Sequence, residues 1–71
     1  MNDKDIITCT INSKEYTFPQ GTTLMKFLEE KTIHPQSVVV EYNGKVLPKG
    51  EYEFELADGD ELEVVQVIGG G

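Results

Sequence analysis

The 71-residue sequence lacks the features that characterise disulfide-rich, membrane-bound and secreted proteins. It contains one cysteine, Cys9, which excludes an internal disulfide and suits a reducing compartment. The charged start, MNDKD, has no signal-like apolar stretch, and no apolar run approaches the length needed to span a membrane. We therefore expect one cytoplasmic domain, near the lower size limit for folding without metals or disulfides.

Positive charge is also scarce, since 13 acidic side chains outnumber six basic ones and leave a net charge of −7. This balance disfavours nucleic acids and anionic membranes as partners. The excess is concentrated in residues 41–71, which hold eight of the acidic and two of the basic residues. It forms either an ordinary solvated surface or an acidic surface that steers this half toward a basic partner groove.

Side-chain catalysis and metal binding are not expected. His34 is the only histidine, so no histidine pair can hold a metal, and its place before Pro35 is typical of a surface residue. Cys9 falls on the inward face of a predicted strand, which favours an inert buried thiol over a nucleophile. The acidic pairs Glu29-Glu30 and Asp58/Asp60 lack apolar neighbours in the sequence that would raise a carboxyl pKa. We accordingly expect neither a metal nor a permanently bound cofactor.

Alternation of apolar and polar residues predicts five strands. They cover residues 6–11, 15–18, 38–42, 45–47 and 61–68. Asn12-Ser13-Lys14 has turn chemistry, and Asn43-Gly44 is a strong signal for a type I′ hairpin. The side chains expected to face the core from these strands are those of Ile7, Cys9, Ile11, Tyr16, Phe18, Val40, Tyr42, Leu62 and Val64.

One helix is predicted between the second and third strands. Its apolar positions follow the i, i+3, i+4 spacing and are Leu24, Phe27 and Leu28. Thr22 or Thr23 can cap its N-terminus, and Pro35 favours an end near Thr32. The order β-β-α-β-β-β places one helix against one mixed sheet of about five strands, which is an α+β domain.

The C-terminal residues Gly69, Gly70 and Gly71 are the least ordinary part of the sequence. Glycine loses more conformational freedom on folding than any other residue, which predicts a mobile tail after the last strand. The remaining candidate for chemistry is the α-carboxylate of Gly71, which becomes a good electrophile only as a mixed anhydride such as an acyl-adenylate. Glycine lacks a Cβ atom and therefore suits the narrow passage that such activation requires.

Four motifs occur in a characteristic order along the chain. They are Gly21-Thr22-Thr23-Leu24, Val40-Glu41-Tyr42-Asn43-Gly44 followed by Pro48, Asp58-Gly59-Asp60, and Val67-Ile68-Gly69-Gly70-Gly71. Over residues 6–71 this set resembles the ubiquitin-like sulfur carriers, and among them most closely the ThiS family of thiamin biosynthesis. The resemblance implies a ubiquitin-like β-grasp domain over residues 6–68, with a disordered extension at residues 1–5 and a flexible tail at residues 69–71.

The resemblance also implies a chemistry. An adenylating enzyme related to ubiquitin-activating enzymes would use ATP to adenylate Gly71. Sulfur from a cysteine desulfurase would convert the product into a thiocarboxylate, and thiazole synthase would consume that sulfur. The carrier would then be a co-substrate and not an enzyme. The partners' active sites would require Gly70 and Gly71, whereas Gly69 would add slack to the tail.

A docking surface is expected just before the tail. Alternation along the third and last strands turns five side chains away from the core, namely Val39, Glu41, Glu63, Val65 and Val67. In the β-grasp order these strands are neighbours, so the valines would form an apolar patch with an acidic rim, suited to a basic partner groove. Isolated exposed valines without a role are the alternative.

Three other interpretations of the chain stay open. It could serve another sulfur pathway, as the small subunit of molybdopterin synthase does, or it could be a protein modifier joined through Gly71 to lysines of its targets. An artificial glycine extension is the third, which the strand running directly into the glycines disfavours. A thiocarboxylate on the free protein would distinguish a carrier from a modifier, which forms isopeptide adducts.

Overall fold

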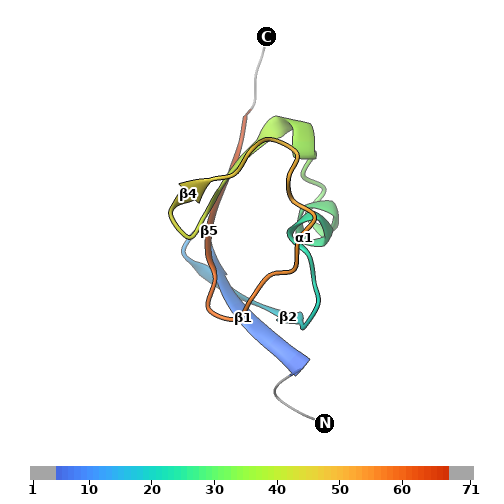
Figure 1. Cartoon of the computed structure of the whole chain (residues 1–71). Coiled ribbons are helices and arrows are strands. Elements are labelled where there is room, and N and C mark those ends of the chain that lie inside the picture. The colour runs from blue at the N-terminus through green and yellow to red at the C-terminus, as the bar shows by residue number, and fades with distance from the viewer. Residues whose placement is uncertain (1–4, 68–71) are drawn as a thin grey trace.

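The computed structural model describes residues 5–67 and shows a mixed sheet with one helix packed against it (Figure 1). The strands are β1 (Ile6–Ile11), β2 (Lys14–Pro19), β3 (Val38–Tyr42), β4 (Lys45–Val46) and β5 (Glu61–Gln66), and the helices are α1 (Leu24–Glu30) and the 3₁₀-helix η2 (Pro35–Ser37). The strand order is β2-β1-β5-β3-β4, so the last strand lies at the centre of the sheet. It runs parallel to β1 and antiparallel to β3. The predicted α+β architecture is confirmed.

Both hairpins close through two-residue turns in which both central residues have positive φ angles, the geometry of a type I′ turn. The φ angles are 53° and 69° for Asn12 and Ser13, and 50° and 90° for Asn43 and Gly44. The right-handed twist of this turn matches that of the strands it joins. Because the first turn uses only two residues, β2 begins at Lys14, one residue earlier than predicted.

The N-terminus of α1 is capped by Thr23. Its Oγ1 accepts a hydrogen bond from the backbone N–H of Lys26 at 3.1 Å, which satisfies one of the free donors of the first turn. Thr22 has another role, because its hydroxyl donates to the carbonyl of Pro19 at 2.7 Å. Of the two predicted caps, Thr23 is therefore the one that the helix uses. No helix within residues 5–67 has the length and apolar content needed to cross a membrane.

The C-terminus of α1 is closed by a Schellman motif. The backbone N–H groups of Thr32 and Ile33 donate to the carbonyls of Glu29 and Leu28 at 3.0 and 2.8 Å. Thr32 occupies the left-handed position, with φ of 58°, where glycine is usual. The helix ends at Glu30 for this local reason, before Pro35 can exert the effect expected from the sequence.

The hydrophobic core lies between α1 and the inner face of the sheet. Its buried side chains are Ile7, Cys9, Ile11, Phe18, Leu24, Phe27, Leu28, Val38, Val40, Tyr52, Leu56, Leu62 and Val64. The three helix positions predicted to be apolar are all among them. Phe27 meets the rings of Tyr16 and Phe18 edge-on, with centroids 5.4 and 5.7 Å apart. The predicted inward residues Tyr16 and Tyr42 are half-buried at the margins of this core.

The segment between β4 and β5 completes the core without regular secondary structure. Tyr52 is only 1% exposed, although no periodic pattern in the sequence indicated it. Its carbonyl and that of Phe54 accept hydrogen bonds from the backbone N–H groups of Met25 and Leu24 at 2.9 and 3.1 Å. These donors belong to the first turn of α1, where no partner exists within the helix. The segment is thus held by the helix N-terminus, and burial of Tyr52 follows from that attachment.

Replacing Phe27 with Ala should lower the free energy of unfolding by about 3–5 kcal/mol, because it leaves a cavity beneath α1. Urea denaturation followed by circular dichroism measures this change. Lys26→Ala is the matched control on the exposed side of the same helix, and its effect should stay within about 0.5 kcal/mol. An unchanged Phe27→Ala protein would contradict the packing described here.

Candidate functional site

The last strand, β5, ends shortly before the C-terminal glycines in the sequence. Val67 is the last described residue, and its backbone N–H donates to the carbonyl of Ser37 at 2.8 Å, so pairing with the β3 side continues one residue past β5. The strand itself ends at Gln66, two residues before its predicted limit. The predicted tail residues Gly69, Gly70 and Gly71 lie outside the described residues, as do residues 1–4 of the predicted extension.

Three valines lie on the outer face of β3 and β5, the face turned away from α1. Val39 and Val65 are directly opposite each other in the antiparallel pairing of the two strands. Val39, Val65 and Val67 are 44%, 56% and 52% exposed, whereas their neighbours Val40 and Val64 are buried. The alternation expected from the sequence is therefore present. We call Val39, Val65 and Val67 the valine patch.

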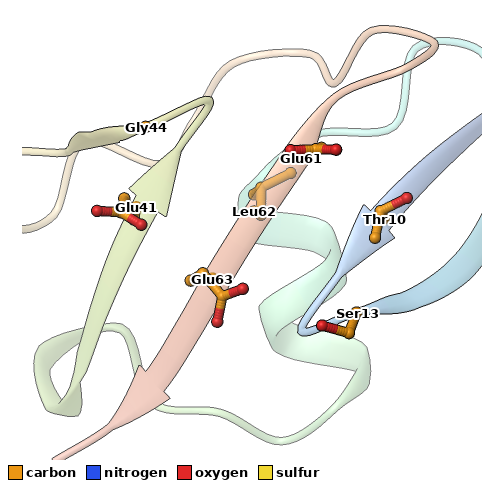
Figure 2. A pocket seen from close by; sticks show the side chains of 7 residues that line it. All are labelled: Thr10, Ser13, Glu41, Gly44, Glu61, Leu62 and Glu63. Carbon is orange, nitrogen blue, oxygen red and sulfur yellow. The ribbon is translucent and has the colours of Figure 1, made fainter.

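Carboxylates continue the same face beyond the valine patch. Glu41 lies directly opposite Glu63, so two like charges occupy one cross-strand pair, an arrangement that destabilises a sheet. Figure 2 shows both side chains with Glu61, the next outward residue of β5, around a shallow depression of about 260 Å³. Thr10 and Ser13 form its other side. We call this hollow the acidic depression.

Glu41 and Glu63 were predicted for this surface from the sequence, whereas Glu61 and Thr10 were not. Glu61 has the same outward parity as Glu63, and this signal could have found it. Thr10 joins the acidic depression because β1 pairs with β5 in parallel, with Thr10 opposite Glu61. No group of three or more His, Cys, Asp or Glu side chains among residues 5–67 is arranged to hold a metal.

A hydrogen-bond network around Asp60 fixes the end of β3 against the start of β5. Tyr42 Oη donates to Asp60 Oδ2 at 2.6 Å, and Asn43 Nδ2 donates to Asp60 Oδ1 at 3.2 Å. The backbone N–H of Ala57 donates to the same carboxylate at 2.8 Å, which leaves Asp60 buried and well partnered. Asn43 Oδ1 in turn accepts from the backbone N–H of Glu61 at 2.8 Å.

This network determines which residues of β3 and β5 face each other, and hence the composition of the outer face. It also changes the acidity of Tyr42. Burial raises the pKa of Tyr42 to about 12, and the hydrogen bond to Asp60 and its negative charge act in the same direction. From the sequence, Asp58-Gly59-Asp60 was only one of the four motifs and its acidic pair was expected to lack apolar surroundings, so the burial of Asp60 and its partnership with Tyr42 are findings of the structure.

Cys9 and His34 are placed as the sequence predicts. Cys9 is 1% exposed, and its Sγ donates to the carbonyl of Ala57 at 3.4 Å. Burial raises the pKa of the Cys9 thiol, and the nearby charge of Asp60 adds to the effect. His34 is exposed, and its Nδ1 accepts a hydrogen bond from the backbone N–H of Gln36 at 3.1 Å. Neither side chain has the partners of a catalytic group.

Comparison with known proteins gives consistent results. The family model described as the ThiS family matches residues 4–71. The sulfur carrier protein ThiS of Bacillus subtilis is 33% identical over 63 residues, which cover 86% of this chain and 96% of that protein. The crystal structure of the thiamine biosynthesis protein ThiS from Geobacter metallireducens superimposes with a TM-score of 0.69 and 28% identity, over 92% of this chain and 100% of that one.

Two larger proteins contain a segment similar to this chain. The thiazole synthases of Paramagnetospirillum magneticum and Magnetococcus marinus are 39% and 37% identical over 62 residues. The matched segment covers 86% of this chain but only 19% of each enzyme. The chain therefore corresponds to a small part of these relatives.

The free energy of unfolding should fall as pH rises from about 10 toward about 12, because the pKa of Tyr42 is near its ordinary value of 10.0 in the unfolded chain but is about 12 in the folded protein. Below pH 10 both states are protonated, so the full contribution of Tyr42 is present. Urea unfolding of wild-type and Tyr42→Phe protein at pH 8, 10 and 11 measures the contribution of Tyr42 to the free energy of unfolding. The advantage of the wild type should shrink between pH 10 and 11, and a constant difference would contradict the raised pKa.

Proposed function

Because the chain belongs to the ThiS family of sulfur carrier proteins, we propose that it carries sulfur as a thiocarboxylate on Gly71 for thiazole formation in thiamin biosynthesis. The observation that carries this proposal is the extent of the family match, which runs through residue 71 and so includes the terminal glycines. The match to a family of sulfur carrier proteins supports a co-substrate role and not that of an enzyme.

The proposed cycle begins with an adenylating enzyme related to ubiquitin-activating enzymes. A carboxylate oxygen of Gly71 attacks the α-phosphorus of ATP, which releases pyrophosphate and forms an acyl-adenylate. A persulfide supplied by a cysteine desulfurase displaces AMP, and a thiol then cleaves the sulfur–sulfur bond to leave the thiocarboxylate. The carrier binds no cofactor of its own, since the adenylating partner consumes the ATP. We place the carrier in the cytoplasm with these enzymes.

Thiazole synthase is the proposed acceptor of the sulfur. Two proteins with that name contain a segment similar to this chain, which supports a partnership between the carrier and a thiazole synthase. Joining two such modules in one chain raises the effective concentration of each for the other. In this protein the same encounter would depend on a docking surface.

The outer face of β3 and β5 is the proposed docking surface for both enzymes. The valine patch offers an apolar centre immediately before the tail, and the acidic depression offers charge beside it. The opposed carboxylates of Glu41 and Glu63 repel each other in the free protein. A lysine or arginine of a partner placed between them would remove that repulsion, so charge complementarity would orient the complex.

Replacing Gly70 with Val, or deleting Gly71, should abolish sulfur loading while leaving the melting temperature nearly unchanged. A β-branched side chain is too wide and too restricted for a passage that fits glycine, whereas a tail after the last strand is not expected to contribute to the core. Intact mass after incubation with ATP, the adenylating enzyme and a sulfur donor shows whether oxygen has been replaced by sulfur. Normal loading of Gly70→Val would falsify the mechanism, and isopeptide adducts of the wild type would indicate a protein modifier instead.

Changing Val65 to Asp should weaken binding to the adenylating enzyme and to thiazole synthase by about tenfold or more, because it places a charge in the apolar centre. Ile6→Asp is the matched control, since both side chains are 56% exposed and Ile6 lies at the opposite end of the sheet. Calorimetric titration and a thermal melt are needed for each variant. Equal affinities of Val65→Asp and Ile6→Asp would rule out the valine patch as the docking centre.

A further inference from the structure

The C-terminal half of β5 has a neighbouring strand on one side only. β1 pairs with β5 at two positions, Thr10 with Glu61 and Ile11 with Leu62, and then turns away. Figure 2 shows the arrow of β1 ending beside the middle of β5, while β5 continues with β3 along its other side. From Val64 onward, no strand within residues 5–67 therefore pairs with the side of β5 that faces away from β3.

The side chain of Asn12 forms hydrogen bonds with the backbone of β5 on this side. Its Oδ1 accepts from the backbone N–H of Val64 at 2.8 Å, and its Nδ2 donates to the carbonyl of the same residue at 3.1 Å. One side-chain amide thus takes the place of the backbone of a neighbouring strand. It also shows that the backbone groups of Val64 point away from β3.

Gln66 is the next residue with the same orientation. The backbone N–H of Val67 points toward β3, where it donates to Ser37, so alternation directs the N–H and C=O of Gln66 to the opposite side. Gln66 and Val38 accordingly form a pair without mutual hydrogen bonds. Within residues 5–67, neither backbone group of Gln66 has a hydrogen-bond partner. We call these two groups the free edge of β5.

A cavity of about 270 Å³ adjoins the free edge on the inner side of the sheet. Its lining consists of Ile11, Asn12, Tyr16, Phe27, Lys31, Ile33, Val64 and Gln66. Lys31 Nζ lies 5.1 Å from the ring centroid of Tyr16 and 6.0 Å from that of Phe27, so an ammonium group stands over an aromatic surface. In a chain of net charge −7, this cavity combines apolar walls with a positive charge.

We propose that thiazole synthase adds an extended segment of its own chain to the free edge of β5, as a further strand of the sheet. The inference rests on the proposed function, which makes thiazole synthase a partner. Backbone pairing with Gln66 satisfies the two open groups, as Asn12 satisfies those of Val64. Alternate side chains of an added strand point to opposite sides, so one enters the cavity beside Tyr16 and Phe27.

The lining of the cavity also indicates which side chains the added segment should carry. Its aromatic and aliphatic walls favour an apolar side chain at the inward position, and Lys31 favours an acidic side chain beside it. The free edge lies one residue before Val67, so pairing there would fix the direction in which the chain leaves the fold. The valine patch provides contact on the outer face, and the free edge provides a second contact on the other side of the same strand.

Gln66→Pro is the sharpest test of the free edge. Proline removes the N–H that the added strand needs, and it is tolerated where that N–H is not used by the sheet itself. Gln66→Ala is the matched control, because it removes the side chain and keeps the N–H. We expect Gln66→Pro to bind thiazole synthase about tenfold more weakly than Gln66→Ala, which isolates the N–H from the side chain, and both variants to melt like the wild type. Equal binding of the two variants would overturn the proposal.

Amide hydrogen exchange gives a second, direct measurement on the wild-type protein. The Gln66 amide should exchange rapidly in the free carrier and become protected in the complex, whereas the Val67 amide is already bonded to Ser37. Lys31→Gln should weaken the complex several-fold, and Lys26→Gln, with the same change of charge inside the helix that Lys31 caps, should not. Binding without protection of Gln66 would overturn the added strand but leave the proposed function intact. Absence of any binding to thiazole synthase would overturn both.

Discussion

The antiparallel pairing of β3 with β5 is the constraint on which the other features of this fold depend. It places Val40 opposite Val64 toward the helix and Val39 opposite Val65 toward solvent. A slip of one residue would exchange these two sets and bury Glu63 in the core. The pairing is fixed near its start by the hydrogen bonds of Asp60 and at its far end by the bond between Val67 and Ser37.

The core is formed by regular strands and a helix and by irregular segments, and these two kinds of segment differ in how far the sequence predicts them. Strands and helix present side chains at regular intervals, and these intervals predicted positions such as Ile7, Phe27 and Leu62. The burial of Tyr52 could not be predicted in this way, because it depends on backbone hydrogen bonds to a helix terminus that is distant in sequence. Likewise, the end of α1 depends on a left-handed Thr32, a conformation that composition does not indicate.

The candidate site shows the same division between local and long-range information. Alternation along each strand predicted that Val39 and Val65 would face outward, but their direct opposition requires the register between two separate strands. The place of Thr10 in the acidic depression and the role of Asn12 both depend on where β1 stops pairing with β5. The α-carboxylate of Gly71 was named from the sequence as a candidate for adenylation, but its conversion to a thiocarboxylate came from family resemblance, since no side-chain geometry could indicate it.

The burial of Cys9 has a consequence for the specificity of sulfur transfer. Persulfides and disulfides exchange readily with accessible thiolates, and any such thiolate on a carrier would divert sulfur away from its intended attachment point. Cys9 is the only cysteine of the 71 residues. It is a buried thiol in the core, and its Sγ donates a hydrogen bond to the carbonyl of Ala57. Within residues 5–67 the folded surface therefore offers no thiol that could compete for sulfur, which agrees with the proposed attachment of sulfur at Gly71.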